Sequence, residues 1–287
     1  VASSSNIPPN RQNAVTWMDA SGNLWMFGGQ TTGTNLFLND LWKYDVSSGN
    51  WTWMSGSNTT NQTGVFGTQN VASSSNVPGA RFGAIGWTDN SNRLWLFGGQ
   101  EYTTAQYRSN DLWMYDISSG LWTWVGGSDQ FDQNGVYGTK GVSSSGNIPG
   151  ARQASAAWKD DSGNFWLFGG YGFPKNGAHN YLSDLWKFNP STLQWTWVSG
   201  NDTTNKVATY GTMGSSSASN IPGSRQMSVT WYGNDGKLWM FGGWGYVSIG
   251  VFGRLNDLWN FDPATSQWTW VSGRNSPDGN GVYGTQN

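Results

Sequence analysis

The feature that most constrains this sequence is a short phrase that occurs four times at an almost constant spacing. A proline is followed three residues later by an arginine at Arg11, Arg81, Arg152 and Arg225, in steps of 70, 71 and 73 residues. Each phrase precedes the same series of four short apolar segments. A fixed period of this kind predicts a repeat architecture, in which each copy is one structural unit that buries its apolar faces only against its neighbours.

The four apolar segments predict β-strands. In the first repeat they are "AVTW", "LWMFGG", "DLWKYD" and "WTWMSG", rich in β-forming residues and separated by turn sequences such as "DASGN" and "SSGN". The second segment is apolar without alternation, as in a strand buried on both faces. We therefore expect one four-stranded antiparallel blade per repeat. The expected blades cover residues 11–56, 81–127, 152–200 and 225–273.

These residues carry a resemblance to a known family. A Gly-Gly pair closes the second segment, and an aromatic residue is followed seven positions later by tryptophan, as in Tyr44 and Trp51. With the Pro-x-x-Arg phrase, this pattern resembles the kelch repeat. The resemblance implies an all-β fold of the β-propeller type. The family usually has more and shorter repeats than the four copies of about 70 residues found here.

The extra length of each repeat lies in the connection between blades. The first connection, residues 57–80, contains "GVFGT" and then "VASSSNVPGA", and the chain begins with "VASSSNIP" and ends with "GVYGTQN". The two ends thus reconstitute one complete connection. We expect a single domain over residues 1–287 that closes as a four-bladed ring. The alternatives are larger rings formed by a longer chain or by two chains.

Composition limits the chemistry that the chain can perform. It has no cysteine, a single histidine (His179), a single glutamate (Glu101) and a formal net charge of −2. No disulfide, thiolate or zinc-ribbon site is possible, and the chain lacks the basic field that a nucleic-acid partner requires. No apolar run is long enough to insert into a membrane. We expect no cofactor and no metal.

Catalysis is not expected either. Galactose oxidase, to whose propeller superfamily the repeats are similar, needs a Cys–Tyr crosslink and histidine ligands for copper, which this sequence lacks. His179 occurs in a loop of one repeat only, where an exposed loop histidine is the simpler interpretation. Most aspartates recur in every repeat, which favours a role in the scaffold. The sequence thus favours a protein that is not an enzyme.

The four repeated arginines allow two interpretations. Each precedes an innermost strand, and four guanidinium groups near a central channel need partners. The aspartates that open the third strands are suitable: Asp40, Asp111, Asp184 and Asp257. We expect blade-locking Arg–Asp pairs. An anion or carboxylate site on the axis, with Arg11, Arg81, Arg152 and Arg225 as ligand-binding residues, is the alternative.

Variable loops favour a binding function on one face of the predicted propeller. The loops between second and third strands, residues 30–39, 100–110, 171–183 and 244–256, differ in sequence while the scaffold stays constant. They hold aromatic residues outside the repeated tryptophans, which suit stacking on sugars or contact with protein. Covering the blade edges is their alternative role. The opposite face has tight turns and no expected pocket. The candidate ligand contacts are Tyr107, Tyr171, Trp244 and Tyr246.

The sequence therefore predicts a non-catalytic binding module. Its expected partner is a glycan or a protein, and its expected location is extracellular or at the cell surface. The second hypothesis is a structural unit that self-assembles into a homo-oligomer, with its loops contacting neighbouring copies. An enzyme of unknown type is the third.

Overall fold

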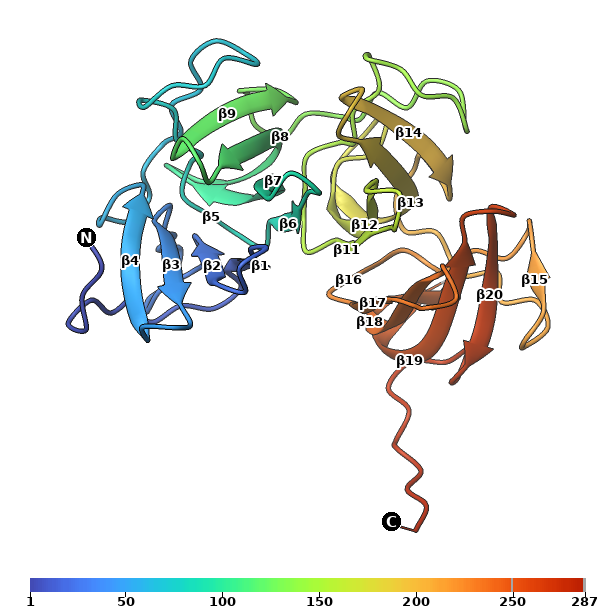
Figure 1. Ribbon diagram of the computed structural model, residues 1–287. Helices are drawn as coiled ribbons and strands as arrows, with labels where there is room; N and C mark the ends of the chain where they lie inside the picture. Colours follow the sequence, from blue (N-terminus) through green and yellow to red (C-terminus); the bar gives the residue numbers. More distant parts are fainter. Residues whose placement is uncertain (249, 286–287) are drawn as a thin grey trace.

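The protein folds into four antiparallel β-sheets, one for each sequence repeat (Figure 1). The structure is a computed structural model and describes residues 1–248 and 250–285. Within these residues all the regular elements are β-strands. The all-β class and the assignment of one sheet to each repeat are confirmed.

The main strands of each sheet form an antiparallel meander in chain order, and in sheet 4 the short strand β15 is added at the outer edge beside β20. Sheet 1 contains β1 (Val15–Met18), β2 (Leu24–Phe27), β3 (Leu41–Asp45) and β4 (Asn50–Ser55). Sheet 2 contains β5 (Arg81–Phe82), β6 (Ile85–Thr88), β7 (Arg93–Tyr102), β8 (Gln106–Asp116) and β9 (Leu121–Gly126). Sheet 3 contains β10 (Arg152–Gln153), β11 (Ala156–Lys159), β12 (Phe165–Gly172), β13 (Asn180–Asn189) and β14 (Gln194–Ser199). Sheet 4 contains β15 (Ser216–Ser217), β16 (Arg225–Gln226), β17 (Val229–Tyr232), β18 (Leu238–Ser248), β19 (Val251–Asp262) and β20 (Gln267–Ser272).

The second and third strands of sheets 2, 3 and 4 are longer than the sequence predicts. Most of the residues expected in loops 100–110, 171–183 and 244–256 instead extend β7–β8, β12–β13 and β18–β19 into long hairpins. A break in register after Phe97, Phe168 and Phe241 separates the scaffold part of each hairpin from its extension. Variable sequence is thus carried on paired strands, which hold their side chains more firmly than loops do.

Each connection adds a further piece to the outer edge of a sheet. Ser3, Ser73 and Ser144 form isolated bridges with the first tryptophan of β4, β9 and β14, and β15 pairs with β20 at the same place. The side chain of Asn76 reinforces this pairing because it donates to the Trp122 carbonyl at 3.1 Å. The long connections are therefore ordered parts of the fold.

Neighbouring sheets pack through two apolar faces that recur in every repeat. We call the side turned to the next sheet the leading face and the side turned to the preceding one the trailing face. Trp17 of sheet 1 is buried, and its indole N–H donates to the Trp95 carbonyl of sheet 2 at 3.0 Å. The leading face of sheet 1 consists of Val15, Trp17, Trp25, Phe27 and Leu41, and it packs on Leu94, Leu96, Trp113, Tyr115 and Trp122 of sheet 2.

Backbone hydrogen bonds join the sheets at their inner edges. Gly83 donates to Asn13 at 3.0 Å, Ala154 to Gly83 at 2.7 Å and Met227 to Ala154 at 2.9 Å. All four residues have a positive φ. The peptide N–H of the equivalent residue in each repeat thus links its sheet to the preceding one.

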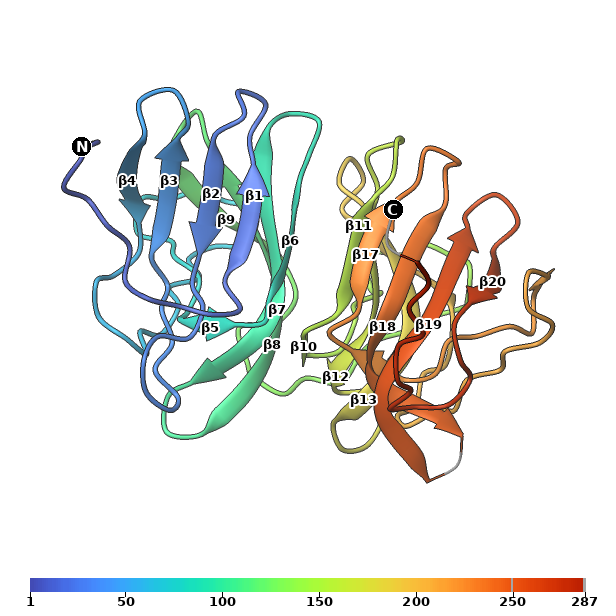
Figure 2. The ribbon, with the colours of Figure 1, turned by 90° about the horizontal axis from the view of Figure 1, so that it is seen from below.

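The four sheets lie along an open arc, with the first and fourth at its two ends (Figures 1 and 2). The expected closure into a four-bladed ring is not seen. The three junctions are filled by whole indole and phenyl rings, and such close packing fixes the angle between neighbouring sheets. With these three angles, the fourth sheet does not come into contact with the first.

A glycine that follows the fourth strand of each repeat offers a test of close packing within a sheet. A Cβ at Gly127 would overlap the carbonyl oxygen of Asn110, and φ there is +74°. Gly141 has a similar φ of +82° but open space around it. We expect Gly141→Ala to cost about 1–2 kcal/mol from backbone strain alone. Gly127→Ala should cost clearly more, because the Asn110 peptide must also move. Urea denaturation of both variants measures the difference, and equal losses would contradict the close approach.

Candidate ligand-binding face and its arginine scaffold

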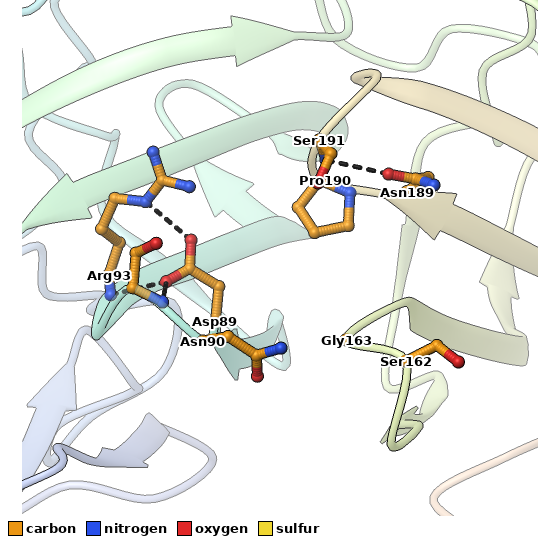
Figure 3. A pocket seen from close by; sticks show the side chains of 9 residues that line it. Asp89, Asn90, Arg93, Ser162, Gly163, Asn189, Pro190 and Ser191 are labelled. Atoms are coloured by element: carbon orange, nitrogen blue, oxygen red, sulfur yellow. Dashed lines mark hydrogen bonds and ion pairs between the residues drawn. The ribbon is translucent and has the colours of Figure 1, made fainter.

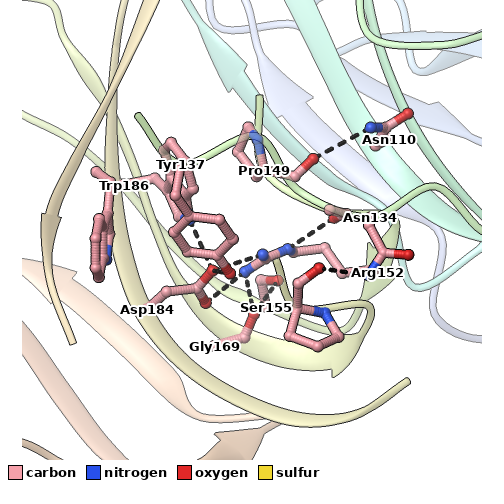
Figure 4. A network of polar contacts seen from close by, with 12 residues as sticks. Asn110, Asn134, Tyr137, Pro149, Arg152, Ser155, Gly169, Asp184 and Trp186 are labelled. Carbon is pink, nitrogen blue, oxygen red and sulfur yellow. Dashed lines mark hydrogen bonds and ion pairs between the residues drawn. The ribbon is translucent and has the colours of Figure 1, made fainter. Parts of the chain in front are cut away.

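The repeated arginines form buried ion pairs with aspartates of their own sheets. Arg152 reaches both carboxylate oxygens of Asp184, with Nη1–Oδ1 and Nη2–Oδ2 distances of 2.7 Å (Figure 4). Its Nη1 also donates to the Gly169 carbonyl and its Nε to the Gly150 carbonyl, both at 3.0 Å. This bidentate geometry is the strongest form of the Arg–carboxylate contact.

The same pair recurs in the other three sheets, so the expected Arg–Asp pairing is confirmed. The pairs are Arg11–Asp40, Arg81–Asp111 and Arg225–Asp257, with N–O distances of 2.6–2.7 Å. Each aspartate also accepts a hydrogen bond from the indole of the tryptophan two residues later. The arginine donors are thus used inside each sheet. They do not line the pocket of about 270 Å³ where the inner strands meet, which is bounded by residues such as Asn13, Gly83 and Met227.

A tyrosine from the preceding connection completes two of these pairs. The Tyr137 hydroxyl donates to Asp184 Oδ2 at 2.6 Å, and the Tyr210 hydroxyl donates to Asp257 Oδ2 at 2.9 Å. Burial and the neighbouring carboxylate raise the pKa of Tyr137, so its hydroxyl stays protonated and donates. Phe66 holds this position next to sheet 2 and packs on the Trp113 ring. The sequence shows that an aromatic residue recurs at this position, but it does not reveal the hydrogen bond to the aspartate.

Sheet 2 lacks this hydroxyl and instead has a second carboxylate beside its arginine. Glu101 Oε1 lies 2.7 Å from Arg81 Nη2 and accepts a hydrogen bond from Ser109. Glu101 is the residue opposite Arg81 on the neighbouring strand. The residue opposite the repeated arginine is Gly172 in sheet 3 and Gly245 in sheet 4. Burial beside a second acid, Asp111, raises the pKa of Glu101 to about 7 despite the attraction of Arg81. One guanidinium therefore faces two buried carboxyl groups.

Three of the four candidate ligand contacts lie together on the extended hairpins. Tyr171 of β12 faces Tyr181 of β13, with ring centroids 5.0 Å apart. Tyr246 of β18 contacts Tyr181 at 6.0 Å and Phe252 at 4.9 Å. Trp244 packs on Phe252 at 5.2 Å. We call these five half-buried residues the hairpin aromatic cluster.

Two arginines that the sequence did not single out hold this cluster. The Arg108 guanidinium lies 4.7 Å from the centre of the Tyr171 ring, and that of Arg254 lies 4.8 Å from the centre of the Trp244 ring. Such cation–π contacts fix a ring while leaving part of it exposed. Their signal in the sequence is weak, because it depends on the cross-strand register of hairpins that we expected to be loops.

Tyr107 lies apart from this cluster. Its ring stacks on Phe131 of the following connection, with centroids 5.0 Å apart and an interplanar angle of 14°. His179 contacts Tyr171 and Phe173 at 5.3 and 5.1 Å, and burial together with Arg108 lowers its pKa. His179 therefore borders the cluster, whereas Tyr107 is not part of it.

A small polar hollow lies on the opposite face, where none was expected (Figure 3). It has a volume of about 160 Å³ between the turns around Asn90, Ser162 and Ser191. Tight turns from neighbouring sheets leave this space between them. The hollow is smaller than the usual ligand site of about 300–1,000 Å³.

Two further properties bear on the kind of site present. Across the described residues, no three His, Asp or Glu side chains are grouped so that they could hold a metal ion. That part of the chain also has no helix with the length and apolarity needed to span a membrane.

Removing an arginine should test the ion pairs. Arg81→Met leaves Asp111 and Glu101 buried without their cation, so we expect a loss of about 3–5 kcal/mol in the free energy of unfolding. Arg93→Met is the matched control, because Arg93 pairs with Asp89 while its own side chain is 34% exposed. That variant should lose less than about 1 kcal/mol. Similar denaturation midpoints for wild type and Arg81→Met would contradict the structural role of the pair.

Glu101 should also give the protein a measurable pH dependence. Between its usual pKa of 4.5 and the folded value of about 7, the folded chain holds a proton that the unfolded chain has lost. The free energy of unfolding should therefore fall as pH rises through this window, by about 3 kcal/mol at most. Glu101→Gln removes this contribution. Unfolding at pH 5 and pH 8 should show a smaller decline in the variant, and equal declines would show that Glu101 is not the group.

Comparison with known proteins adds no assignment. No protein-family model and no curated protein matches this sequence.

Proposed function

We propose that this chain is a non-catalytic binding module with a kelch-like, propeller-type fold that recognises a glycan or a protein through its extended hairpins. The observation that carries the proposal is the hairpin aromatic cluster, whose five rings lie next to one another on sheets 3 and 4 and remain half-exposed. Such rings on a fixed frame offer large contact area at small entropic cost.

The surroundings of the cluster favour a preformed surface. Tyr171 and Trp244 are each backed by a guanidinium, and the strands that carry them are paired along their length. A ligand therefore meets rings that are already oriented, which reduces the cost of binding. Stacking on a sugar ring or on a partner's side chain uses the exposed side of each aromatic residue.

The polar groups of the scaffold support a role without catalysis. Arg152, Asp184 and Tyr137 satisfy one another inside sheet 3, as do their counterparts in sheet 4. His179 contacts the Tyr171 and Phe173 rings, and the nearby Arg108 contributes to lowering its pKa. None of these groups is presented as an acid–base pair to a ligand. We further propose an extracellular or cell-surface location, where glycan ligands are exposed.

A glycan-array screen followed by paired variants tests the proposal. Trp244→Ala with Tyr246→Ala removes two rings of the cluster, so affinity for a glycan found in the screen should fall about tenfold for each contact worth ~1–2 kcal/mol. Asn90→Ala, at the hollow on the opposite face, is the matched control and should bind normally.

Melting curves establish that the variants remain folded. Undiminished affinity in the double variant would contradict the assignment of this face. Weakened binding in Asn90→Ala would place the site on the face with the tight turns. If no glycan binds, the same variants can be compared against a protein ligand.

A further inference from the structure

The leading face of sheet 4 has the residues of a junction but no sheet packed on it. Trp231 is 52% exposed, whereas its counterparts Trp17, Trp87 and Trp158 are 4–6% exposed. Two further residues of this face show the same difference. Val229 and Phe241 are exposed, whereas their counterparts in sheet 1, Val15 and Phe27, are buried. Large contiguous apolar surfaces of this kind mark interaction sites.

The trailing face of sheet 1 is its unpartnered complement. Leu24 is 47% exposed, whereas its counterparts Leu94, Phe165 and Leu238 are fully buried. An apolar hollow of about 510 Å³ lies over Leu24, Met26 and Trp51. At the internal junctions, the equivalent positions receive the leading face of the preceding sheet.

The segment Gly281–Thr285 carries a third part of the junction. Its counterparts around Phe66, Tyr137 and Tyr210 dock on the following sheet, where Val65 forms a bridge with Val77 and Val136 with Ile148. By the same register Val282 would face Ile7, and Tyr283 would donate its hydroxyl to Asp40. Instead Ile7, Val282 and Tyr283 are 78%, 89% and 93% exposed.

We propose that a second copy of this chain covers these surfaces, with the leading face of sheet 4 and the segment Gly281–Thr285 of one copy docked on sheet 1 of the next. The partner copy would then supply the hydroxyl that completes the Arg11–Asp40 pair. Such a head-to-tail contact is heterologous and forms a ring where the rotation closes.

A second copy fits better than closure of one chain on itself. The three internal junctions are close-packed and hold the first and fourth sheets at opposite ends of the arc (Figures 1 and 2). Self-closure would require all three junctions to change. A second copy meets both faces while every junction stays as it is, and it reproduces an interface that the chain already forms three times.

Cysteine crosslinking distinguishes these arrangements, because the chain has no native cysteine. Residues that face each other in such a bridge lie about 5.5 Å apart at Cα, within disulfide range. Ile7→Cys and Val282→Cys are made in separate chains, one with a mass tag, then mixed and oxidised. The double variant Val65→Cys/Val77→Cys is the internal control, and it should form an intramolecular disulfide.

The proposal predicts a covalent heterodimer in the mixture and little product from either single variant alone. Trp231→Ser, a substitution at an exposed position, should lower the yield of heterodimer at least severalfold while the melting of the single chain is unchanged. Two results would overturn the proposal. One is no heterodimer although the control pair closes. The other is a monomer with an intramolecular disulfide when Ile7→Cys and Val282→Cys are combined in one chain.

Discussion

The buried arginine–aspartate pair is the interaction on which the rest of this structure depends. Each pair ties the inner edge of a sheet to its third strand, and the aspartate also holds an indole. A charge pair this deeply buried is favourable only when its remaining hydrogen-bonding groups are satisfied. In sheets 3 and 4 a tyrosine from the preceding connection satisfies one of them. The hydrogen bonds of the buried pair in these sheets are therefore completed by the connection that leads in from the preceding sheet.

This dependence explains how a constant frame carries variable sequence. The pairs and the tryptophan faces occupy the scaffold part of each hairpin, and the break in register after Phe97, Phe168 and Phe241 marks where it ends. Beyond the break, side chains lie outside the repeated tryptophan faces and make contacts that differ from one pair of sheets to the next, such as Arg108 on Tyr171 and Tyr246 on Tyr181. Aromatic residues such as Trp244 and Tyr246 can differ between repeats without loss of the frame, which suits a surface used for recognition.

The sequence predicts well whatever recurs in every repeat. The strands, the sheet of each repeat and pairs such as Arg81–Asp111 follow from period and spacing, because identical residues in register have identical surroundings. Features of single repeats are harder to predict. Glu101 replaces a glycine in one sheet, and its partner Arg81 is apparent only from the cross-strand register. The hairpin extensions were expected to be loops, since their pairing depends on contacts that variable sequence does not reveal.

The open arc could not be predicted from the sequence either. Whether the sheets close into a ring depends on the angles between packed sheets, and no sequence motif specifies these angles. We propose that each sheet needs a neighbour on both sides, so that the exposed faces of sheets 1 and 4 are halves of one junction. The thermal midpoint measured against protein concentration tests this claim directly, since association that stabilises the folded state makes the midpoint depend on concentration. If the two faces pair, the midpoint rises with protein concentration. A midpoint that stays constant, with the mass of a single chain throughout, would contradict it.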